Sequence, residues 1–333
     1  MTRTAVFGSG SWGTAFAAVL ADAGGEVVLH ARRPEVAEAI NADHVNAAYL
    51  PELALPDAVS ATHDPATATA GADLVVLAIP SQTLRTNLEE WGRHLPAGVP
   101  VVSLMKGIEL GTGRRMSEVI QEAAGVPRDQ VVVLSGPNLS HEIAARQPAA
   151  AVVACSDLGA AEQVAAACAT SYFRPYTQTD VIGAELGGAV KNVIALAVGM
   201  AEGLGYGDNT KATIITRGLA ETARLGAALG ADAATLMGLA GVGDLIATCM
   251  SPLSRNHAFG VNLGKGLSVE EVVAITSQTA EGVKSCRSVV DLAATQGVDM
   301  PICAGVRAVV EHAIDVRELG DHLMSRPHKH ERH

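Results

Sequence analysis

The chain has 333 residues and a formal net charge of −11, with 48% hydrophobic and 18% charged residues. This length predicts about two domains, and the composition is that of a globular protein with a large core. The acidic excess argues against nucleic acid or an anionic membrane surface as a partner. A site for an anionic small molecule must therefore concentrate Lys and Arg locally.

Five cysteines are scattered along the chain without a C-x-x-C pair, so neither a disulfide framework nor a zinc site is predicted. The first residues lack a basic segment followed by an apolar one, as a secretion signal would have. Lys191 interrupts the longest apolar helix, and we expect no membrane span. These features predict a cytoplasmic protein without membrane insertion and without a metal site.

A glycine-rich turn near the start is the first functional motif. Residues 5–7 predict a buried strand, residues 15–24 predict a helix, and Gly8, Gly10 and Gly13 between them have the G-x-G-x-x-G spacing. In a dinucleotide site the first glycine makes the turn, the second admits the pyrophosphate, and the third admits the helix. The alternative is a plain strand–helix connection in another α/β domain.

The end of the second predicted strand, residues 26–31, bears on the choice of dinucleotide. An NAD site usually carries Asp or Glu there, about 20 residues beyond the glycines. This chain has Arg32 and Arg33 instead, and two guanidinium groups suit a 2′-phosphate. We therefore favour NADP(H), with NAD(H) left open. The alternative is that both arginines only border a solvated loop.

The remainder of the first half alternates between strands and helices. Further strands are predicted at 58–62, 74–79, 99–104, 131–135, 148–155 and 172–176, with helices at 34–42, 81–94 and 158–169. This alternation predicts a doubly wound, mostly parallel sheet of the Rossmann type with helices on both faces. We assign residues 1–179 to this α/β domain.

Only helical patterns follow. They are predicted at 180–203, 211–229, 231–239, 254–265, 268–275, 283–296 and 304–311. Residues 180–324 are therefore predicted to form an all-α domain that binds substrate. Residues 325–333, SRPHKHERH, are predicted to be a disordered tail; metal binding by its histidines is the lesser alternative.

Two lysines stand out. Lys106 follows a predicted strand at the sheet edge where ligands bind, although a lone lysine there is more often a solvated surface group. Lys191 lies beside Asn192 inside an apolar helix. Burial lowers the pKa of a lysine, and this suits a general acid or base. The alternative for Lys191 is a side chain that extends to the surface from a core helix.

Polar residues cluster again between 238 and 256. Asp244 and Thr248 have i, i+4 spacing and share one helix face, so Asp244 is able to orient Lys191 or a substrate hydroxyl. A helix N-cap is the alternative role for Asp244. Ser254, Arg255 and Asn256 begin another helix. Free backbone N–H groups beside a guanidinium make an anion site, so a phosphate is expected there.

Taken in order, these stretches resemble the bacterial NAD(P)-dependent sn-glycerol-3-phosphate dehydrogenase family. The matching stretches are GSGSWGTA (8–15), INADHVNAAYLP (40–51), MKGIE (105–109), SGPNLSHEIA (135–144), GAVKNVIALAVGMAEGLGYGDNTKA (188–212), GLAGVGDLIATC (238–249) and AEGV (280–283). The resemblance covers nearly the whole chain.

The resemblance implies a role for individual residues. Lys191 would be the general base. The implied cofactor contacts, beyond the glycines, are Ser11, Trp12, Arg32, Arg33, Lys106, Ser140, Arg255, Thr279 and Glu281. The implied contacts to glycerol phosphate are Lys106, Gly136, Asn138, Lys191, Asp244, Ser254, Arg255 and Asn256.

The chain departs from the family pattern at two of these positions. Asn138 replaces the usual Ser; it still donates and accepts hydrogen bonds. Thr279 stands where an apolar residue is usual, so only a backbone contact is expected there.

The implied function is the interconversion of dihydroxyacetone phosphate and sn-glycerol 3-phosphate by hydride transfer, which supplies glycerophospholipid synthesis. Lys106 and Asn192 would polarise the carbonyl, and Asp244 and Thr248 would position Lys191. One alternative is a related two-domain reductase of a small hydroxy acid, such as ketopantoate, and another is a non-catalytic NADP sensor. The partner predicted is a small phosphorylated substrate, and a homodimer is left open.

Overall fold

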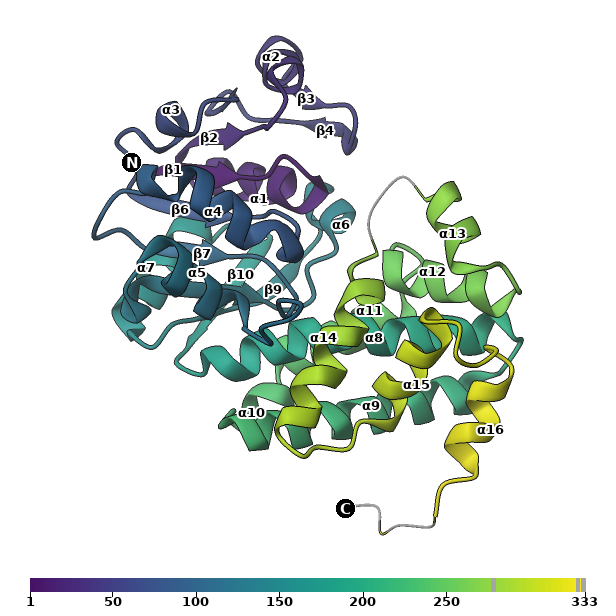
Figure 1. Cartoon of the computed structure of the whole chain (residues 1–333). Helices are drawn as coiled ribbons and strands as arrows, with labels where there is room; N and C mark the ends of the chain where they lie inside the picture. The colour runs from purple at the N-terminus through teal and green to yellow at the C-terminus, as the bar shows by residue number, and fades with distance from the viewer. Residues whose placement is uncertain (277–279, 328–329, 331–333) are drawn as a thin grey trace.

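A computed structural model describes residues 1–276, 280–327 and 330. Residues up to Gln178 form a sheet flanked by helices, and residues from Val181 onward form a group of packed helices (Figure 1). The N-terminus lies on the sheet side, and the last described helix lies at the opposite end of the molecule.

Within the described residues, eight strands form one sheet with the order β10-β9-β8-β7-β6-β1-β2-β5. The strands are β1 (Arg3–Phe7), β2 (Glu26–His30), β5 (Val59–Thr62), β6 (Leu74–Leu77), β7 (Val101–Ser103), β8 (Val131–Ser135), β9 (Ala149–Ala154) and β10 (Phe173–Gln178). Neighbouring strands run parallel except for β8 and β9. The predicted mostly parallel sheet is confirmed.

The register explains why the strands read as unbroken apolar runs. Val6 of β1 lies opposite Leu29 of β2 and Val76 of β6, and all three are fully buried. Helices cover both faces, so both sides of each central strand need apolar side chains.

The helices of this part are α1 (Ser11–Asp22), α2 (Pro34–Asp43), α3 (Pro65–Thr69), α4 (Leu84–Trp91), α5 (Met116–Ala124), α6 (Ser140–Ala144) and α7 (Leu158–Cys168), with 3₁₀ turns η1 (Ser81–Thr83), η2 (Gly92–His94) and η3 (Arg128–Gln130). The prediction of one helix over 81–94 is wrong in detail, because η1 and η2 flank the shorter α4. Helices α3, α5 and α6 were not predicted. Neither was the antiparallel pair β3 (Val45–Asn46) and β4 (Leu50–Ala54).

The second part is built from α8 (Val181–Gly203), α9 (Asp208–Leu229), α10 (Ala233–Leu236), the π-helical turn η4 (Leu239–Gly243), α11 (Asp244–Met250), α12 (Arg255–Gly264), α13 (Val269–Ile275), α14 (Glu281–Thr295), α15 (Pro301–Val310) and α16 (Glu318–Met324). The predicted helix over 231–239 is wrong. The structure has α10 and η4 in its place. The backbone of η4 packs closely against the end of α10, since a Cβ on Gly241 would lie 1.9 Å from the Leu236 carbonyl oxygen. Helix α11 contains the helical stretch expected at Asp244 and Thr248, whereas α16 was not predicted.

The predicted disordered tail begins with residues that have partners. Ser325 donates its backbone N–H to the Asp321 carbonyl, and Arg326 forms an ion pair of 2.5 Å with Asp299. Residues 328–329 and 331–333 of the tail lie outside the described residues.

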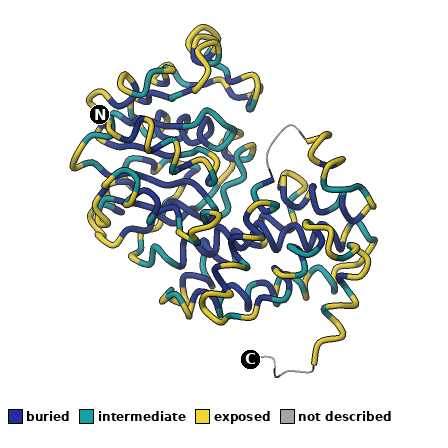
Figure 2. The backbone as a smooth tube through the Cα atoms, in the orientation of Figure 1, coloured by how far each residue is buried: buried dark blue, intermediate teal, exposed yellow. Residues whose placement is uncertain are grey.

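Helix α8 is the centre of the helical part, and residues 183–201 of it are buried (Figure 2). Helix α12 crosses it at glycines. A Cβ on Gly260 would lie 2.2 Å from the Leu196 carbonyl oxygen, and one on Gly199 would lie 2.2 Å from the His257 carbonyl oxygen. Small residues on both helices thus permit close backbone contact.

Among the described residues, two helical segments are long and apolar enough to cross a membrane by length and composition alone: 181–203 and 233–250. The apolar window in the first is 89% buried inside the protein, as expected of a core helix.

The crossing of α8 and α12 can be tested with Gly260→Ala. Helix propensity alone would favour alanine by about 1 kcal/mol. The added methyl group must displace the backbone of α8, however, so we expect a net loss of about 1–3 kcal/mol in the free energy of unfolding. Urea unfolding measures this loss. Gly207→Ala is the control, because a Cβ there meets no atom within 4 Å. Equal stability of the two variants would contradict the proposed close packing.

Candidate active site

The glycine turn has the geometry that a dinucleotide requires. Gly8 has φ +113°, a conformation that L side chains rarely adopt, and a Cβ on Gly13 would lie 2.0 Å from the Gly8 carbonyl oxygen. A Cβ on Gly10 would meet no protein atom within 4 Å, so the space above it is open to a ligand. Helix α1 begins at Ser11, directly after the turn and earlier than predicted, so its N-terminal N–H groups lie beside that open space.

The residues after the turn also fit a bound cofactor. Within the described chain, the Ser11 hydroxyl and the Trp12 indole N–H are buried and have no hydrogen-bond partner. Buried polar atoms are normally paired, so unpaired ones beside open space indicate a ligand. Asn46, whose role was not predicted, supports the turn: its side-chain amide donates to the Ser9 carbonyl at 2.8 Å and to the Thr14 hydroxyl at 2.9 Å.

A cleft of about 660 Å³ runs from this turn to the helical part. The predicted residues that line it are Gly8, Gly10, Ser11, Trp12, Arg32, Arg33, Lys106, Asn138, Ser140, Lys191, Asn192, Thr248, Ser254, Arg255, Asn256 and Glu281. The lining also includes Tyr49, His30, His63 and His141, which were not predicted. Thr279 lies outside the described residues. Gly13, Gly136 and Asp244 are not among the residues that line the cleft.

Arg32 and Arg33 lie at the end of β2, where the predicted selectivity for the dinucleotide would reside. Both are exposed, and the Arg33 Nε lies 3.7 Å from a carboxylate oxygen of Glu35. His30, beside them, places Nε2 3.2 Å from the His63 carbonyl oxygen. Burial lowers the pKa of His30 and so favours its neutral form, while Arg32 and Arg33 bring positive charge to this end of the cleft.

The other end of the cleft holds two lysines on one carboxylate. Lys191 Nζ donates to Asp244 Oδ1 and to the Thr248 hydroxyl, both at 2.6 Å. Lys106 Nζ donates to Asp244 Oδ2 at 2.7 Å and to the Gly136 carbonyl at 2.8 Å. Asp244 is 1% exposed, and its carboxylate is the anion between the two ammonium groups.

These contacts decide between the alternative roles raised by the sequence. Lys106 and Lys191 are held in the interior, so neither is a solvated surface group. Gly243 occupies the N-cap position of α11, and Asp244 is the first residue of the helix, so Asp244 is not the N-cap. Its carboxylate binds the lysines instead.

The pKa of the Lys106 ammonium group is lower than that of an exposed lysine. Burial and the nearby Lys191 charge lower its pKa to about 8, although Asp244 opposes the shift. Near neutral pH Lys106 is therefore a cation that loses its proton only slightly above the physiological range.

Asn192 connects the lysines to the next helix. Its side-chain amide lies 3.4 Å from the Lys106 carbonyl oxygen, and its Oδ1 accepts from the Asn256 side chain at 2.9 Å. Asn256 Oδ1 in turn accepts from the Gly282 backbone at 2.8 Å. Asn192 thus ties the segment at Lys106 to α12 and α14.

The start of α12 has the predicted arrangement. Ser254 is the N-cap, and its hydroxyl accepts from the His257 backbone N–H at 3.3 Å. Arg255 follows at the first helical position and lines the cleft. Glu281, also in the lining, has a pKa raised by burial and lowered less strongly by Arg255.

Asn138 is the residue at which the chain departs from the family pattern. Within the described residues, both its side-chain Oδ1 and Nδ2 are buried without a hydrogen-bond partner, and the side chain lines the cleft. Gly136, two residues earlier, contributes its carbonyl oxygen to Lys106. Asn138 therefore has donor and acceptor capacity left for a ligand.

Asp244→Asn tests the shared carboxylate. Two buried ammonium groups would then face each other without an anion, so we expect the free energy of unfolding at pH 7 to fall by about 3–5 kcal/mol. Thr248→Val, which removes one neutral partner of Lys191, should cost about 1 kcal/mol. Urea unfolding measures both losses.

The loss in Asp244→Asn should shrink as the pH rises. Asp244 raises the pKa of Lys106, so without its carboxylate Lys106 loses its proton at a lower pH than in the wild type. The cost of burying an unpaired ammonium group therefore declines as the pH rises toward about 8. A loss that is small at pH 7, or that grows toward pH 10, would contradict the arrangement.

Comparison with known proteins supports one family. The chain matches the model of the NAD-dependent glycerol-3-phosphate dehydrogenase N-terminus over residues 3–161 and that of its C-terminus over residues 180–321. A Streptomyces griseus protein named glycerol-3-phosphate dehydrogenase (NAD(P)+) is 62% identical over 330 residues, covering 99% of this chain and 98% of that protein.

Solved structures agree. The crystal structure of glycerol-3-phosphate dehydrogenase from Coxiella burnetii superposes with a TM-score of 0.93 at 33% identity, covering 98% of this chain and 99% of that chain. A ketopantoate reductase from Ralstonia eutropha shares the fold alone, with a TM-score of 0.61 at 18% identity, covering 96% of this chain and 100% of that chain. The chain belongs to the NAD-dependent glycerol-3-phosphate dehydrogenase family.

Proposed function

We propose that this protein catalyses the NAD(P)H-dependent interconversion of dihydroxyacetone phosphate and sn-glycerol 3-phosphate. The observation that carries the proposal is the pair Lys106 and Lys191 on Asp244, in the same cleft as the glycine turn. Such a pair offers a proton donor and a carbonyl-polarising cation where a cofactor and a small substrate meet. We further propose that the product supplies glycerophospholipid synthesis.

Lys191 is the proposed general acid in the reducing direction. A bound nicotinamide supplies the hydride to C2 of the substrate. Lys191 gives its proton to the C2 oxygen as charge develops there, and it takes the proton back in the reverse direction. Asp244 and Thr248 hold the Lys191 ammonium by bonds of 2.6 Å, so its position is set before the substrate arrives.

Lys106 is the proposed electrostatic partner. Its charge polarises the carbonyl and stabilises the developing alkoxide. Asn192 holds the Lys106 segment through a hydrogen bond to the Lys106 carbonyl oxygen. The contact of Asn192 with the substrate stays a prediction.

The phosphate end of the substrate is assigned to the start of α12. Ser254, Arg255 and Asn256 combine backbone N–H groups, a guanidinium and a side-chain amide. Gly136 and Asn138 are proposed to complete the substrate contacts, with the unpaired amide of Asn138 replacing the hydroxyl usual in the family.

The cofactor contacts are proposed from the cleft lining: the glycine turn, Ser11, Trp12, Lys106, Ser140, Arg255 and Glu281, with Thr279 retained as a prediction. NADP(H) is proposed over NAD(H), since Arg32 and Arg33 occupy the ribose end and each offers a guanidinium to a 2′-phosphate.

We also propose a domain boundary between residues 179 and 180, since β10 ends at Gln178 and α8 begins at Val181. A cytoplasmic location is supported by the five cysteines, all within the described ranges and all free thiols. The burial of α8 supports the absence of membrane insertion. A homodimer stays a prediction.

A reductase of a small hydroxy acid is the second candidate, since ketopantoate reductase shares the fold. Its substrate ends in a carboxylate and needs no phosphate site, so the Ser254–Asn256 segment favours a phosphorylated substrate. The non-catalytic sensor is disfavoured by the Lys191–Asp244–Thr248 contacts, which cofactor binding alone would not require.

The proposed function is tested by following NADPH oxidation at 340 nm with dihydroxyacetone phosphate and, separately, with ketopantoate. Lys191→Ala should lower kcat with dihydroxyacetone phosphate by about 10²–10⁴-fold, because the proton donor is gone, while NADPH binding is retained. Lys211→Ala is the control, since Lys211 pairs with Glu202 and Asp208 on the surface. Turnover of ketopantoate alone, or near-normal turnover by Lys191→Ala, would contradict the assignment.

Cofactor preference is tested with Arg33→Asp. A charge-assisted hydrogen bond to phosphate is worth about 1.5–3 kcal/mol, so the ratio of kcat/KM for NADPH to that for NADH should fall by about 10- to 100-fold. Arg146→Asp, at an exposed ion pair with Asp22, is the control. An unchanged ratio would show that Arg33 does not read the 2′-phosphate.

A further inference from the structure

The segment from Lys106 to Arg115 is held on two sides. It leaves the sheet after β7 and closes on itself, with Ile108 and Arg115 paired as an antiparallel bridge. The Glu109 backbone N–H donates to the Arg114 carbonyl at 2.8 Å. Lys106, at the start of this loop, depends on the loop for its position.

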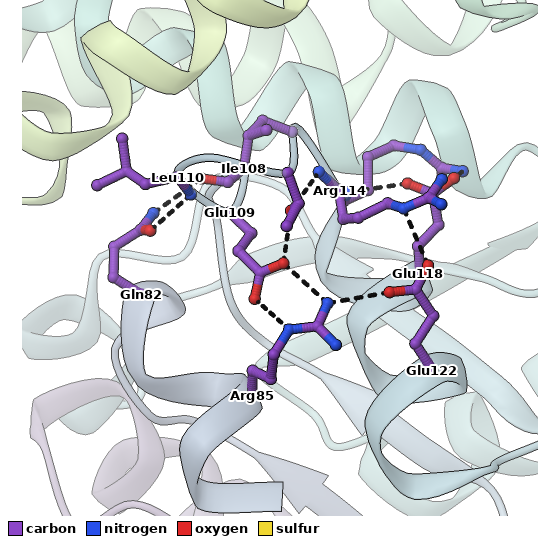
Figure 3. A network of polar contacts seen from close by, with 10 residues as sticks. Gln82, Arg85, Ile108, Glu109, Leu110, Arg114, Glu118 and Glu122 are labelled. Atoms are coloured by element: carbon purple, nitrogen blue, oxygen red, sulfur yellow. Dashed lines mark hydrogen bonds and ion pairs between the residues drawn. The ribbon is translucent and has the colours of Figure 1, made fainter. Parts of the chain in front are cut away.

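One side of the loop is fixed to neighbouring helices of the sheet part. Arg85 of α4 makes two bonds of 2.9 Å to the Glu109 carboxylate, and Gln82 donates to the Ile108 carbonyl at 2.8 Å (Figure 3). The Arg85 side chain is 31% exposed, so solvent weakens this ion pair.

The other side is fixed to α8 by Glu185, and this contact is buried. Glu185 Oε2 accepts from the Arg115 guanidinium and from the Ser117 hydroxyl, and Oε1 accepts from the Ser117 backbone, each at 2.7 Å. The Glu185 side chain is 2% exposed. The Glu185 carboxylate accepts three hydrogen bonds, one of them from a cation, so its removal leaves buried donors unpaired and should cost more than breaking the partly exposed Arg85–Glu109 pair.

The loop also inserts into the helical part. Ile108 is fully buried and packs in the same apolar cluster as Leu186 and Ala189 of α8. The loop is therefore docked on α8 by apolar packing near Lys106 and by the Glu185 contact at its far end.

The face of α8 that receives the loop is continuous. Glu185, Gly188 and Asn192 are spaced i, i+3, i+7 and so share one face of the helix. Glu185 binds the end of the loop, and Asn192 binds the Lys106 carbonyl. A Cβ on Gly188 would lie 3.1 Å from Lys106 Cγ, so the lysine stem passes over Gly188.

We infer that Glu185 is a positioning residue for the reaction: through Arg115 and Ser117 it clamps the Lys106 loop onto α8 and thereby sets where the Lys106 ammonium lies. This inference rests on the proposed function, because the position of Lys106 matters only if Lys106 acts on the substrate. Glu185 itself is not among the residues that line the cleft.

The test compares Glu185→Gln with Glu221→Gln. Glu221 is a matched control: it is 1% exposed, lies on α9, and accepts from the backbone N–H groups of Ile302 and Cys303 at the start of α15. Both variants replace a buried glutamate that accepts hydrogen bonds from the N-terminus of a helix, α5 for Glu185 and α15 for Glu221. The measurements are kcat and KM for NADPH with dihydroxyacetone phosphate, the Tm, and hydrogen exchange at the Glu109 and Gly113 amides.

We expect Glu185→Gln to lower kcat by at least tenfold, with KM for NADPH within twofold of the wild type and faster exchange at both loop amides. Glu221→Gln should lower the Tm while kcat and loop exchange stay within twofold. Arg115→Met should reproduce the Glu185→Gln pattern, and the double variant should lose no more kcat than either single variant, because both remove the same contact.

Unchanged kcat in Glu185→Gln would overturn the inference, as would losses of kcat in both glutamate variants in proportion to their Tm. Unchanged hydrogen exchange at the Glu109 and Gly113 amides in Glu185→Gln would show that Glu185 does not hold the loop, whatever the effect on kcat. Failure of the wild type to turn over dihydroxyacetone phosphate would instead remove the proposed function, and with it the catalytic meaning of the clamp, so the two failures are distinguishable.

Discussion

A single buried carboxylate shared by two ammonium groups is the interaction on which the site depends. Asp244 is the first residue of α11, Lys191 lies within α8, and Lys106 follows β7 of the sheet. Each element alone would leave a charge in the interior without a partner, at a high cost in free energy. The cluster therefore exists only when the sheet part and the helical part are docked together. This requirement couples the assembly of the cleft to the assembly of the fold.

Glycines on α8 permit the close contacts around the site. A Cβ on Gly187 would lie 2.2 Å from the Ala240 carbonyl oxygen, so the π-helical turn that precedes Asp244 contacts the helix backbone directly. Gly188 gives the same close approach to the Lys106 stem, and Gly199 gives it to α12. Glycine weakens a helix interior by roughly 0.5–1 kcal/mol relative to alanine. Packing along α8, which is buried from 183 to 201, offsets this loss. The glycines thus lower the intrinsic helix propensity of α8 and permit close backbone contact where the functional side chains meet.

The sequence predicted the sheet well and the small elements poorly. Strands buried on both faces, such as β6, read as unbroken apolar runs, and the glycine spacing marked the first turn. The two-residue strand β3 and the five-residue helix α6 are too short to show a period. Helix α5 carries no capping signature in the sequence, because Arg115 occupies its N-cap position where Ser, Thr, Asp or Asn would mark a helix start. A contact between Lys191 and Asp244 was one of the roles that the sequence left open for Asp244. The contacts of Lys106 with Asp244, and of Arg115 with Glu185, join residues far apart in the chain. No local pattern encodes such pairs, and only the docking of the two parts creates them.

The charge distribution shows why these long-range contacts are needed. The chain carries a net charge of −11, so its overall field repels a phosphorylated substrate and a dinucleotide phosphate alike. The cleft reverses this sign locally, with Arg32 and Arg33 at one end and Lys106, Lys191 and Arg255 at the other. Asp244 neutralises only one of the two lysine charges, so a positive charge remains where substrate oxygens are proposed to lie. Removing that carboxylate would leave two ammonium groups close together without the anion that pairs them, at a cost in stability. A two-to-one ratio of ammonium groups to carboxylate is therefore what makes the site both stable enough to form and attractive to an anion.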